Sequence, residues 1–350
     1  MGEKPILMIL TGGTICSVLN DREETQSDAD RTVTLLENRL KDGGAFWQGV
    51  TFVREKPVDM LSENMTIGSW NRLIGYLKTV DWHRYRGAIV LHGTDTLAYG
   101  SSLLAVLLAG IAVPVCLVSG NYRLDDPRTN GHANFACAVD LILGGMQPGV
   151  YVPYRNDDGT MWVHRGAHLE QCRPQSINFH SATAMTAQQA LDQTGCPSRG
   201  RPLIGDLVQL QDWVLQISPY VGINYSRFGL EGVRAVVHGV YHSSTACVGT
   251  STDDQPDDAP HSVLHLIRRC RQQGIDLFLA PVPGDFDDRQ EHNLYSSTGI
   301  MCRQGALLLR GMTWEMATVK TLIACALYED RSKRLQFLEG DVCGETMSRR

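Results

Sequence analysis

The chain has 350 residues, of which 43% are hydrophobic and 20% charged, a composition typical of a folded globular protein. Its formal net charge of −6 and its pI near 6 argue against nucleic-acid binding, which requires clustered basic residues. The longest apolar stretch, Leu103 to Val118, contains Pro114 and falls short of the roughly 20 residues that a membrane-spanning helix needs. We therefore expect neither nucleic acid nor membrane as a partner.

The ten cysteines have neither the CxxC pattern nor the mixed Cys and His spacing of a zinc site, so we expect reduced thiols and no metal. The first eight residues lack the cationic and apolar regions of a secretion signal. Both observations favour a cytoplasmic protein.

Short apolar runs alternate with segments of helical length, which predicts βαβ units and a mostly parallel sheet. In the first half of the chain the pattern predicts a helix at 96–109 and strands at 5–10, 87–91 and 113–118. Each of these strands ends in a polar turn that contains glycine: Thr11–Thr14, His92–Asp95 and Ser119–Tyr122. Ligands of open α/β sheets gather beyond the carboxyl ends of the strands, so we expect the three turns to form one site.

A segment rich in Gly, Pro and polar residues, 194–201, is the best candidate for a domain boundary. The predicted domains are an N-terminal one at 1–193 and a C-terminal one at 213–350, with a linker at 194–212. The second domain is also expected to be α/β, with a helix at 262–273 and strands at 213–217, 233–240 and 276–280. The acidic segment 250–261 is expected to be a solvated loop.

The turn after the first predicted strand lacks the patterns of phosphate-binding loops and leaves the Thr14 hydroxyl at the end of a strand. Such a hydroxyl is a poor nucleophile until a base and an oxyanion site act on it. The second turn adds Thr94 and Asp95 at the start of a helix, where N–H groups can stabilise an oxyanion. Each turn also has a purely structural interpretation, since Asp95 or Thr94 could simply cap the helix.

Together, TGGTI at 11–15 and HGTDT at 92–96 resemble the two signature segments of the L-asparaginase family. Further segments resemble that family, and its bacterial cytoplasmic type I branch in particular, in the same order: LSENMT at 61–66, RTNG at 128–131, HRG at 164–166 and GMTWE at 311–315. The match is patchy but spans nearly the whole chain.

The resemblance implies two α/β domains, a larger N-terminal one with a mostly parallel, flavodoxin- or Rossmann-like sheet and a smaller C-terminal one. It implies a homodimer or homotetramer without metal or organic cofactor. The implied reaction is hydrolysis of the side-chain amide of L-asparagine, or of a related small amino-acid amide, through an ester on Thr14.

The resemblance also assigns roles to single residues. Thr14 matches the nucleophile, and Thr94 matches the second hydroxyl of a proton relay. Asp95 matches the carboxylate that binds the substrate α-ammonium. Ser62, with the backbone at Gly13 and Gly93, matches the binding site of the α-carboxylate. Glu63, next to Ser62, stands where relatives carry Gln or Ser.

Two residues of the family pattern are missing. The relay Lys follows the Arg of the Arg-Gly pair by six residues, which is Gln171 here, and no Lys lies between Lys78 and Lys320. A Gln can neither carry a positive charge nor accept a proton. The family also places a Tyr on a lid soon after the nucleophile, whereas segment 19–31 is charged and polar and contains no Tyr.

Two hypotheses follow. The first is a divergent amidohydrolase, in which a neighbour of Gln171 in sequence (His168, Arg165 or Arg173) could compensate for the missing Lys, a His as a base and an Arg as a charge. The second is a catalytically impaired or repurposed protein that binds an amino-acid-like ligand, with Glu63 and Asp95 as paired acids, or acts in a pathway-specific reaction.

Overall fold

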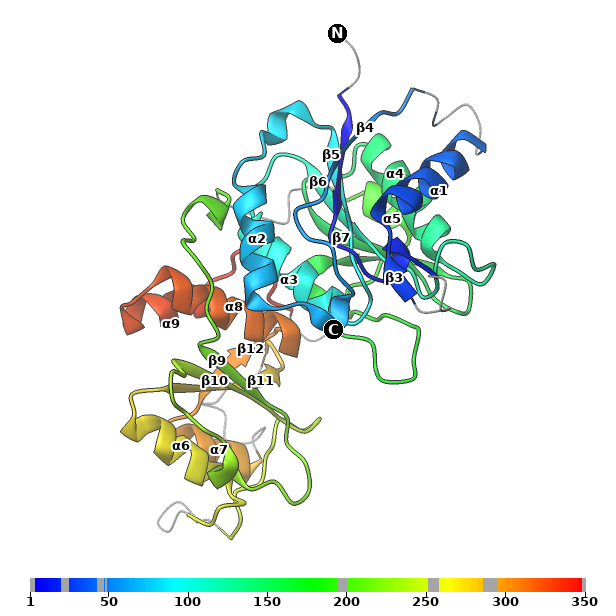
Figure 1. Ribbon diagram of the computed structural model, residues 1–350. Helices are drawn as coiled ribbons and strands as arrows, with labels where there is room; N and C mark the ends of the chain where they lie inside the picture. Colours follow the sequence, from blue (N-terminus) through cyan, green and yellow to red (C-terminus); the bar gives the residue numbers. More distant parts are fainter. Residues whose placement is uncertain are drawn as a thin grey trace. The chain divides into compact units, whose positions relative to one another are not determined.

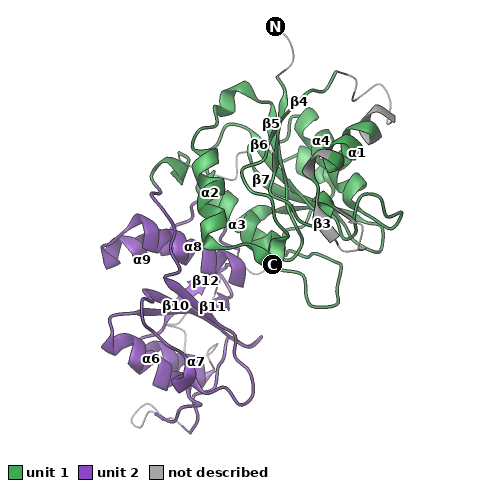
Figure 2. Ribbon diagram, viewed as in Figure 1, with its two compact units in different colours: residues 1–206 green, residues 207–350 purple. Residues whose placement is uncertain are grey.

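The computed structural model describes residues 4–19, 25–42, 47, 49–193, 201–250, 258–285 and 295–347 (Figure 1). The chain divides into two compact units, residues 1–206 and 207–350 (Figure 2). Three of the predicted segments lie partly outside the described residues: the lid at 20–24, the linker at 194–200 and the acidic loop at 251–257.

The first unit is built on a six-stranded sheet with the order β4-β1-β5-β6-β7-β8. Neighbouring strands run parallel, except that β8 is antiparallel to β7. A separate short hairpin pairs β2 with β3. The elements in chain order are β1 (Ile6–Leu10), β2 (Ser17–Leu19), β3 (Thr25–Ser27), α1 (Ala29–Asp42), β4 (Phe52–Glu55), α2 (Ile67–Leu77), β5 (Gly87–Leu91), α3 (Leu97–Leu107), β6 (Pro114–Val118), α4 (Gly131–Leu143), β7 (Gly149–Arg155), β8 (Met161–Arg165) and α5 (Ala187–Leu191).

The second unit is built on a four-stranded sheet with the order β12-β11-β10-β9, in which all neighbours are parallel. Its elements in chain order are β9 (Val214–Ile217), β10 (Ala235–Gly239), α6 (Val263–Gln272), β11 (Asp276–Val282), α7 (Ser296–Arg303), β12 (Leu307–Arg310), α8 (Trp314–Leu327) and α9 (Arg331–Glu339). The expected fold class, two α/β domains with mostly parallel sheets, is confirmed.

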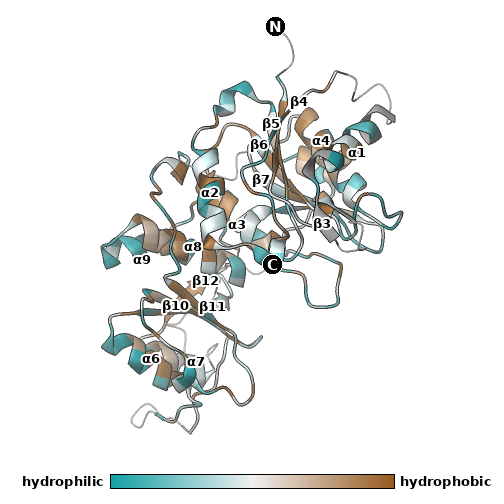
Figure 3. Ribbon diagram, in the orientation of Figure 1, coloured by the Kyte–Doolittle hydropathy of each residue, from teal (hydrophilic) through white to brown (hydrophobic). Residues whose placement is uncertain are grey.

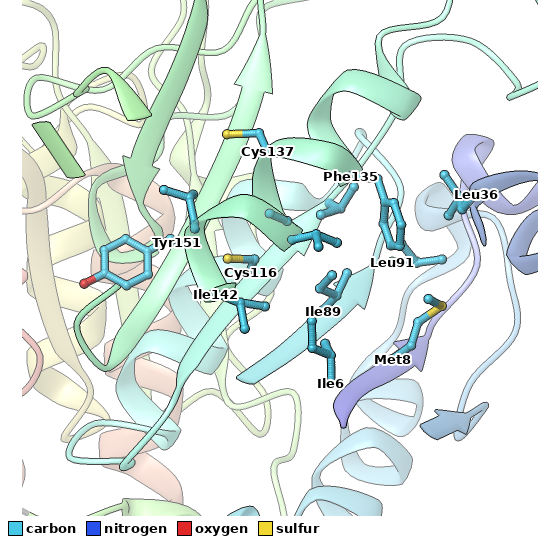
Figure 4. Close-up of a cluster of buried hydrophobic side chains, with 14 of the residues drawn as sticks. Ile6, Met8, Leu36, Ile89, Leu91, Cys116, Phe135, Cys137, Ile142 and Tyr151 are labelled. Carbon is cyan, nitrogen blue, oxygen red and sulfur yellow. The ribbon is translucent and has the colours of Figure 1, made fainter. Parts of the chain in front are cut away.

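The central strands β1, β5 and β6 are buried on both faces, which explains why they are continuous apolar runs without alternation. On one face, side chains such as Met8, Ile89 and Cys116 pack against Leu36 of α1 and Phe135 of α4 (Figure 4). Helices α2 and α3 lie along the opposite face of this sheet (Figure 1). The carboxyl ends of the three strands therefore come together at one edge of a rigid, doubly covered sheet.

Helix α6 of the second unit shows how amphipathic segments build the outer layers. Its buried residues follow the helical repeat and pack into the core of that unit, and its other face is polar (Figure 3). None of the described helices is long and apolar enough to span a membrane.

A fully buried ion pair lies in the second unit. The Lys320 ammonium on α8 is 2.5 Å from a carboxylate oxygen of Glu345, which belongs to the segment after α9. The ammonium also donates to the carbonyl oxygens of Leu338 and Gly340. Burial by itself raises the pKa of Glu345, but the ammonium and the hydrogen bonds that the carboxylate accepts lower it to about 2. The Glu345 carboxyl group is therefore ionised at neutral pH.

Substitution of Lys320 alone is expected to destabilise the protein strongly. Lys320→Met leaves a buried carboxylate without its counter-ion, so the free energy of unfolding should fall by about 3–5 kcal/mol. The double variant Lys320→Met/Glu345→Gln should recover most of this loss, because no buried charge remains. Urea denaturation at pH 7 measures both changes.

The matched control is Glu329→Gln, which removes a surface ion pair with Arg234 in which the Glu329 side chain is 83% exposed. Its effect should stay below about 1 kcal/mol. Equal losses in the control and in Lys320→Met would contradict a special role for the buried pair.

Candidate functional site

The turns that follow β1 and β5 touch through their backbones. A Cβ atom on Gly13 would lie 2.2 Å from the Cα of Gly93, so only glycine permits this approach. Gly13 also has φ = +88°, a left-handed conformation that favours glycine. Thr11 fastens the contact, since its N–H and its hydroxyl both donate to the carbonyl oxygen of Leu91, at 3.0 and 2.8 Å.

The loop that contains Ser62 completes this contact. Ser62 is 3% exposed, and a Cβ atom on Gly93 would lie 2.3 Å from its hydroxyl oxygen. The Ser62 hydroxyl donates to the Asp95 carboxylate at 3.3 Å and accepts from the Asp95 N–H at 3.2 Å. Thr96 donates its hydroxyl to the Ser62 carbonyl oxygen. Ser62 thus holds the Asp95 carboxylate in position, a role that the resemblance does not suggest.

Thr14 opens a short 3-10 helix, Thr14–Cys16, directly after Gly13. The helix is held by the Cys16 N–H and the Ser17 hydroxyl, which both donate to the Gly13 carbonyl oxygen. Thr14 is half-buried, and its hydroxyl has no hydrogen-bond partner among the described residues. The predicted nucleophile therefore sits beside the Gly13–Gly93 contact without a base bound to it there.

A cavity of about 320 Å³, here called the Thr94 cavity, lies beside the second turn. It is lined by residues from the second and third turns, from β7 and from segment 171–179: Thr94, Asp95, Asn121, Tyr154, Gln171, Cys172, Arg173, Pro174, Gln175, Ser176, Ile177 and Phe179. Thr14 and Ser62 are not lining residues. Glu63 is exposed and does not line it either, so Glu63 and Asp95 do not share this cavity as paired acids.

Asn121, in the turn after β6, is fixed by reciprocal bonds with Asn130. The Asn121 N–H donates to the Asn130 side chain and the Asn130 N–H donates to the Asn121 side chain, both at 2.9 Å. The third turn therefore reaches the same place as the second. This agrees with the expectation that turns at neighbouring strand ends come together.

Gln171, at the position of the missing Lys, binds the start of α3. Its side-chain nitrogen donates to the carbonyl oxygen of Thr94 at 2.9 Å, and its side-chain oxygen accepts from the N–H of Ala98 at 3.2 Å. The helix begins after Thr96, whose side chain makes no capping hydrogen bond. The interpretation that Asp95 or Thr94 caps this helix is therefore wrong, because Ser62 binds the Asp95 carboxylate and Gln171 supplies the acceptor.

Two of the three neighbours proposed as substitutes for the Lys have other partners. His168 is buried with its Nδ1 2.6 Å from the Thr183 hydroxyl, and Arg165 donates to the Gln193 side chain. Arg173 is the one of the three that lines the Thr94 cavity. The next Lys in the chain, Lys320, is buried in the ion pair of the second unit.

Tyr154 is a cavity residue that the sequence pattern does not single out, because it lies within the apolar run of β7. Its hydroxyl is fully buried and has no hydrogen-bond partner of normal geometry among the described residues. Burial raises its pKa to about 12, against a smaller opposite effect of the Asn130 side chain. Tyr154 is therefore a neutral hydrogen-bond donor near Thr94.

His92, the first residue of HGTDT, has a structural role. Its side chain is buried, and Nδ1 lies 2.8 Å from the carbonyl oxygen of Gly93, to which it donates. Burial lowers the pKa of the imidazole, so it stays neutral at pH 7. Among the described residues, no three His, Cys, Asp or Glu side chains are grouped so that they could hold a metal ion.

Enlarging Gly93 is expected to separate the turns. In Gly93→Ala the added methyl group overlaps Ser62, so the free energy of unfolding should fall by about 1–3 kcal/mol. The matched control is Gly75→Ala in α2, where nothing lies within 4 Å of the new methyl group. That change should stabilise the protein by about 0.5–1 kcal/mol through helix propensity. Thermal and urea unfolding measure both changes. A Gly93→Ala variant as stable as the wild type would refute the close contact.

Comparisons with known proteins identify the family and the fold. The family described as "Asparaginase, N-terminal" matches residues 5–194. The D subunit of glutamyl-tRNA(Gln) amidotransferase from Saccharolobus islandicus is 23% identical over 97% of this chain and 75% of its own length. Its counterpart from Thermoplasma volcanium is 31% identical over 47% of this chain and 39% of its own length.

Two solved structures share the fold over 99% of this chain and 100% of their own. The thermostable L-asparaginase from Thermococcus kodakarensis superimposes with a TM-score of 0.74 at 19% identity. L-asparaginase I from Vibrio cholerae superimposes with a TM-score of 0.72 at 17% identity. Since the family match covers more than half of the residues and the fold agrees along the chain, this protein belongs to the asparaginase family.

Proposed function

We propose that the protein is an amidohydrolase that cleaves the side-chain amide of L-asparagine, or of a related small amino-acid amide, through an ester on Thr14. The observation that carries the proposal is the close approach of Gly13 to Gly93 and of Gly93 to Ser62, which joins the turn that contains Thr14 to the turn that contains Asp95. A carboxylate suits an α-ammonium group, and a strand-end hydroxyl suits attack on the amide.

In the proposed reaction the Thr14 oxygen attacks the amide carbon while its proton leaves. The carbon–nitrogen bond then breaks, the nitrogen takes up a proton, and ammonia departs. Water hydrolyses the resulting ester and restores the hydroxyl. Thr94 is the expected second hydroxyl of the relay, but Gln171 cannot exchange a proton with it. Loss of one general acid or base typically costs about 10²–10⁴-fold in rate, so turnover is expected to be slow.

The proposal is tested by ammonia release from asparagine and glutamine by the purified protein. Thr14→Ala should abolish the release, because it removes the nucleophile, and Thr14→Ser should retain part of it. The exposed Thr79 provides a matched control, and Thr79→Ala should leave the rate unchanged. Equal release by the wild type and Thr14→Ala would overturn the proposal.

A second experiment replaces Gln171. Gln171→Lys restores an ionisable group beside Thr94 but removes the acceptor for the Ala98 N–H. Turnover should rise by about tenfold or more, since a general acid or base contributes at least that much. The free energy of unfolding should fall by roughly 1 kcal/mol for the lost hydrogen bond.

Gln171→Met is the control for the second effect, because it removes both hydrogen bonds and adds no charge. It should lower stability without any gain in turnover. A gain in Gln171→Met equal to that in Gln171→Lys would exclude a proton relay as the cause.

The second candidate function is a binding or regulatory protein without fast catalysis. It is favoured by the structural use of Gln171, whose amide serves the start of α3, and by relatives named as amidotransferase subunits. A rise in melting temperature with amino-acid ligands, without ammonia release, would support it. In either case we propose a cytoplasmic homodimer or homotetramer, which light scattering can test for its assembly.

A further inference from the structure

One wall of the Thr94 cavity is formed by segment 171–179, a loop whose ends are held together by hydrogen bonds. Segment 171–179 is closed at its base by the Glu170 N–H, which donates to the His180 carbonyl oxygen at 3.1 Å. Beyond it, the His164 Nδ1 lies 2.8 Å from the Ser181 hydroxyl. Next to His180, Asn156 and Phe179 exchange two hydrogen bonds of 3.1 Å each. These bonds hold the base of the loop, and its exposed residues 173–177 form the outer part of the cavity wall.

The cavity has one charge of each sign. Asp95 and Arg173 are the only ionisable lining residues that are charged at neutral pH. Ser62 orients the Asp95 carboxylate, whereas the Arg173 guanidinium forms no ion pair among the described residues. Burial, and to a lesser extent Asp95, raises the pKa of the Cys172 thiol, so Cys172 stays neutral. The cavity therefore offers a cation site and an anion site within one space.

Other lining groups add hydrogen-bond donors. The Tyr154 hydroxyl is buried, and no described residue lies in hydrogen-bonding geometry with it. The Asn121 side-chain oxygen accepts from Asn130, which leaves its amide nitrogen as a donor. Arg173 presents a planar guanidinium suited to a carboxylate. The guanidinium of Arg173, with these two donors in the same cavity, favours an anionic group on the ligand.

We infer that the Thr94 cavity is a specificity pocket for a carboxylate carried on the amine side of the substrate amide, with Arg173 as its anchor. This rests on the proposed function, with the substrate α-ammonium at Asp95 and the α-carboxylate at the turn of Gly93, as the resemblance to the family implies. Arg173 is then left for an additional carboxylate. The substrate class is an N-substituted side-chain amide of aspartate, with β-aspartylglycine as its simplest member.

The volume fits this class. About 320 Å³ is at the small end of ligand pockets, which is suitable for an amino-acid-sized extension and too small for a long peptide. The chemistry also balances. Thr14 forms an ester with the acyl group, the carbon–nitrogen bond breaks, and glycine leaves after its nitrogen gains a proton. Water then releases aspartate, so one water is consumed for each amide cleaved.

The experiment compares β-aspartylglycine with asparagine as substrates of the full chain, followed by the release of aspartate. The wild type should show a kcat/KM for β-aspartylglycine about tenfold or more above that for asparagine, the effect of one well-placed charged hydrogen bond. Arg173→Gln should remove this preference by lowering kcat/KM for β-aspartylglycine about tenfold or more. Arg173→Lys should keep part of it, because the charge remains but the bidentate geometry is lost. Arg84→Gln, at another exposed arginine, should change neither substrate.

Failure of the pocket and failure of the proposed function give different results. Calorimetric binding of β-aspartylglycine to Thr14→Ala needs no turnover. Binding that Arg173→Gln weakens about tenfold or more would support the pocket even if the wild type releases nothing. Thr14-dependent asparagine hydrolysis with no preference, and with binding unchanged in Arg173→Gln, would overturn the pocket alone. A preference that Arg173→Gln leaves intact would also overturn it.

Discussion

The closeness of two peptide backbones governs this site. Gly13, Gly93 and Ser62 occupy a space with no room for one additional carbon atom, and they come from three segments that are far apart in sequence. This contact sets where Thr14 begins its short helix and how Ser62 meets Asp95. The sheet fixes the positions of the two turns, since β1 and β5, which precede them, are paired in register along their whole length. The close approach of the turns thus depends on the pairing of the strands that precede them.

Gln171 makes two hydrogen bonds at the position where the family pattern has a lysine. A lysine can donate hydrogen bonds and carry charge, but it cannot accept the Ala98 N–H. An amide does both bonding tasks with neutral atoms, and so it ties Thr94 to the first turn of α3. Arg173 retains a positive charge near the same cavity, which shifts the role of charge from proton transfer towards recognition.

Much of the fold was accessible from apolar runs alone. The strands predicted at 87–91 and 113–118 agree with β5 and β6 to within a residue, because buried parallel strands must be continuously apolar. The meeting of the three turns also followed from strand ends. The partners of Gln171 did not, because they depend on side-chain direction across long separations. Tyr154 could not be predicted as a cavity residue for a similar reason. In sequence it belongs to the apolar run of β7, and only its unpaired hydroxyl distinguishes it from an ordinary core residue.

The tail of the second unit has a consequence for biosynthesis. Lys320 is added to the growing chain before Glu345, the counter-ion that it has in the interior of the folded unit. Until residues 341–347 emerge, the ammonium must stay solvated, so α8 cannot settle into its final place. The first unit has no such dependence on later residues in its sheet, since all six strands end by Arg165. Vectorial synthesis would thus complete the two units at different times, and premature termination before Glu345 would leave the second unfinished.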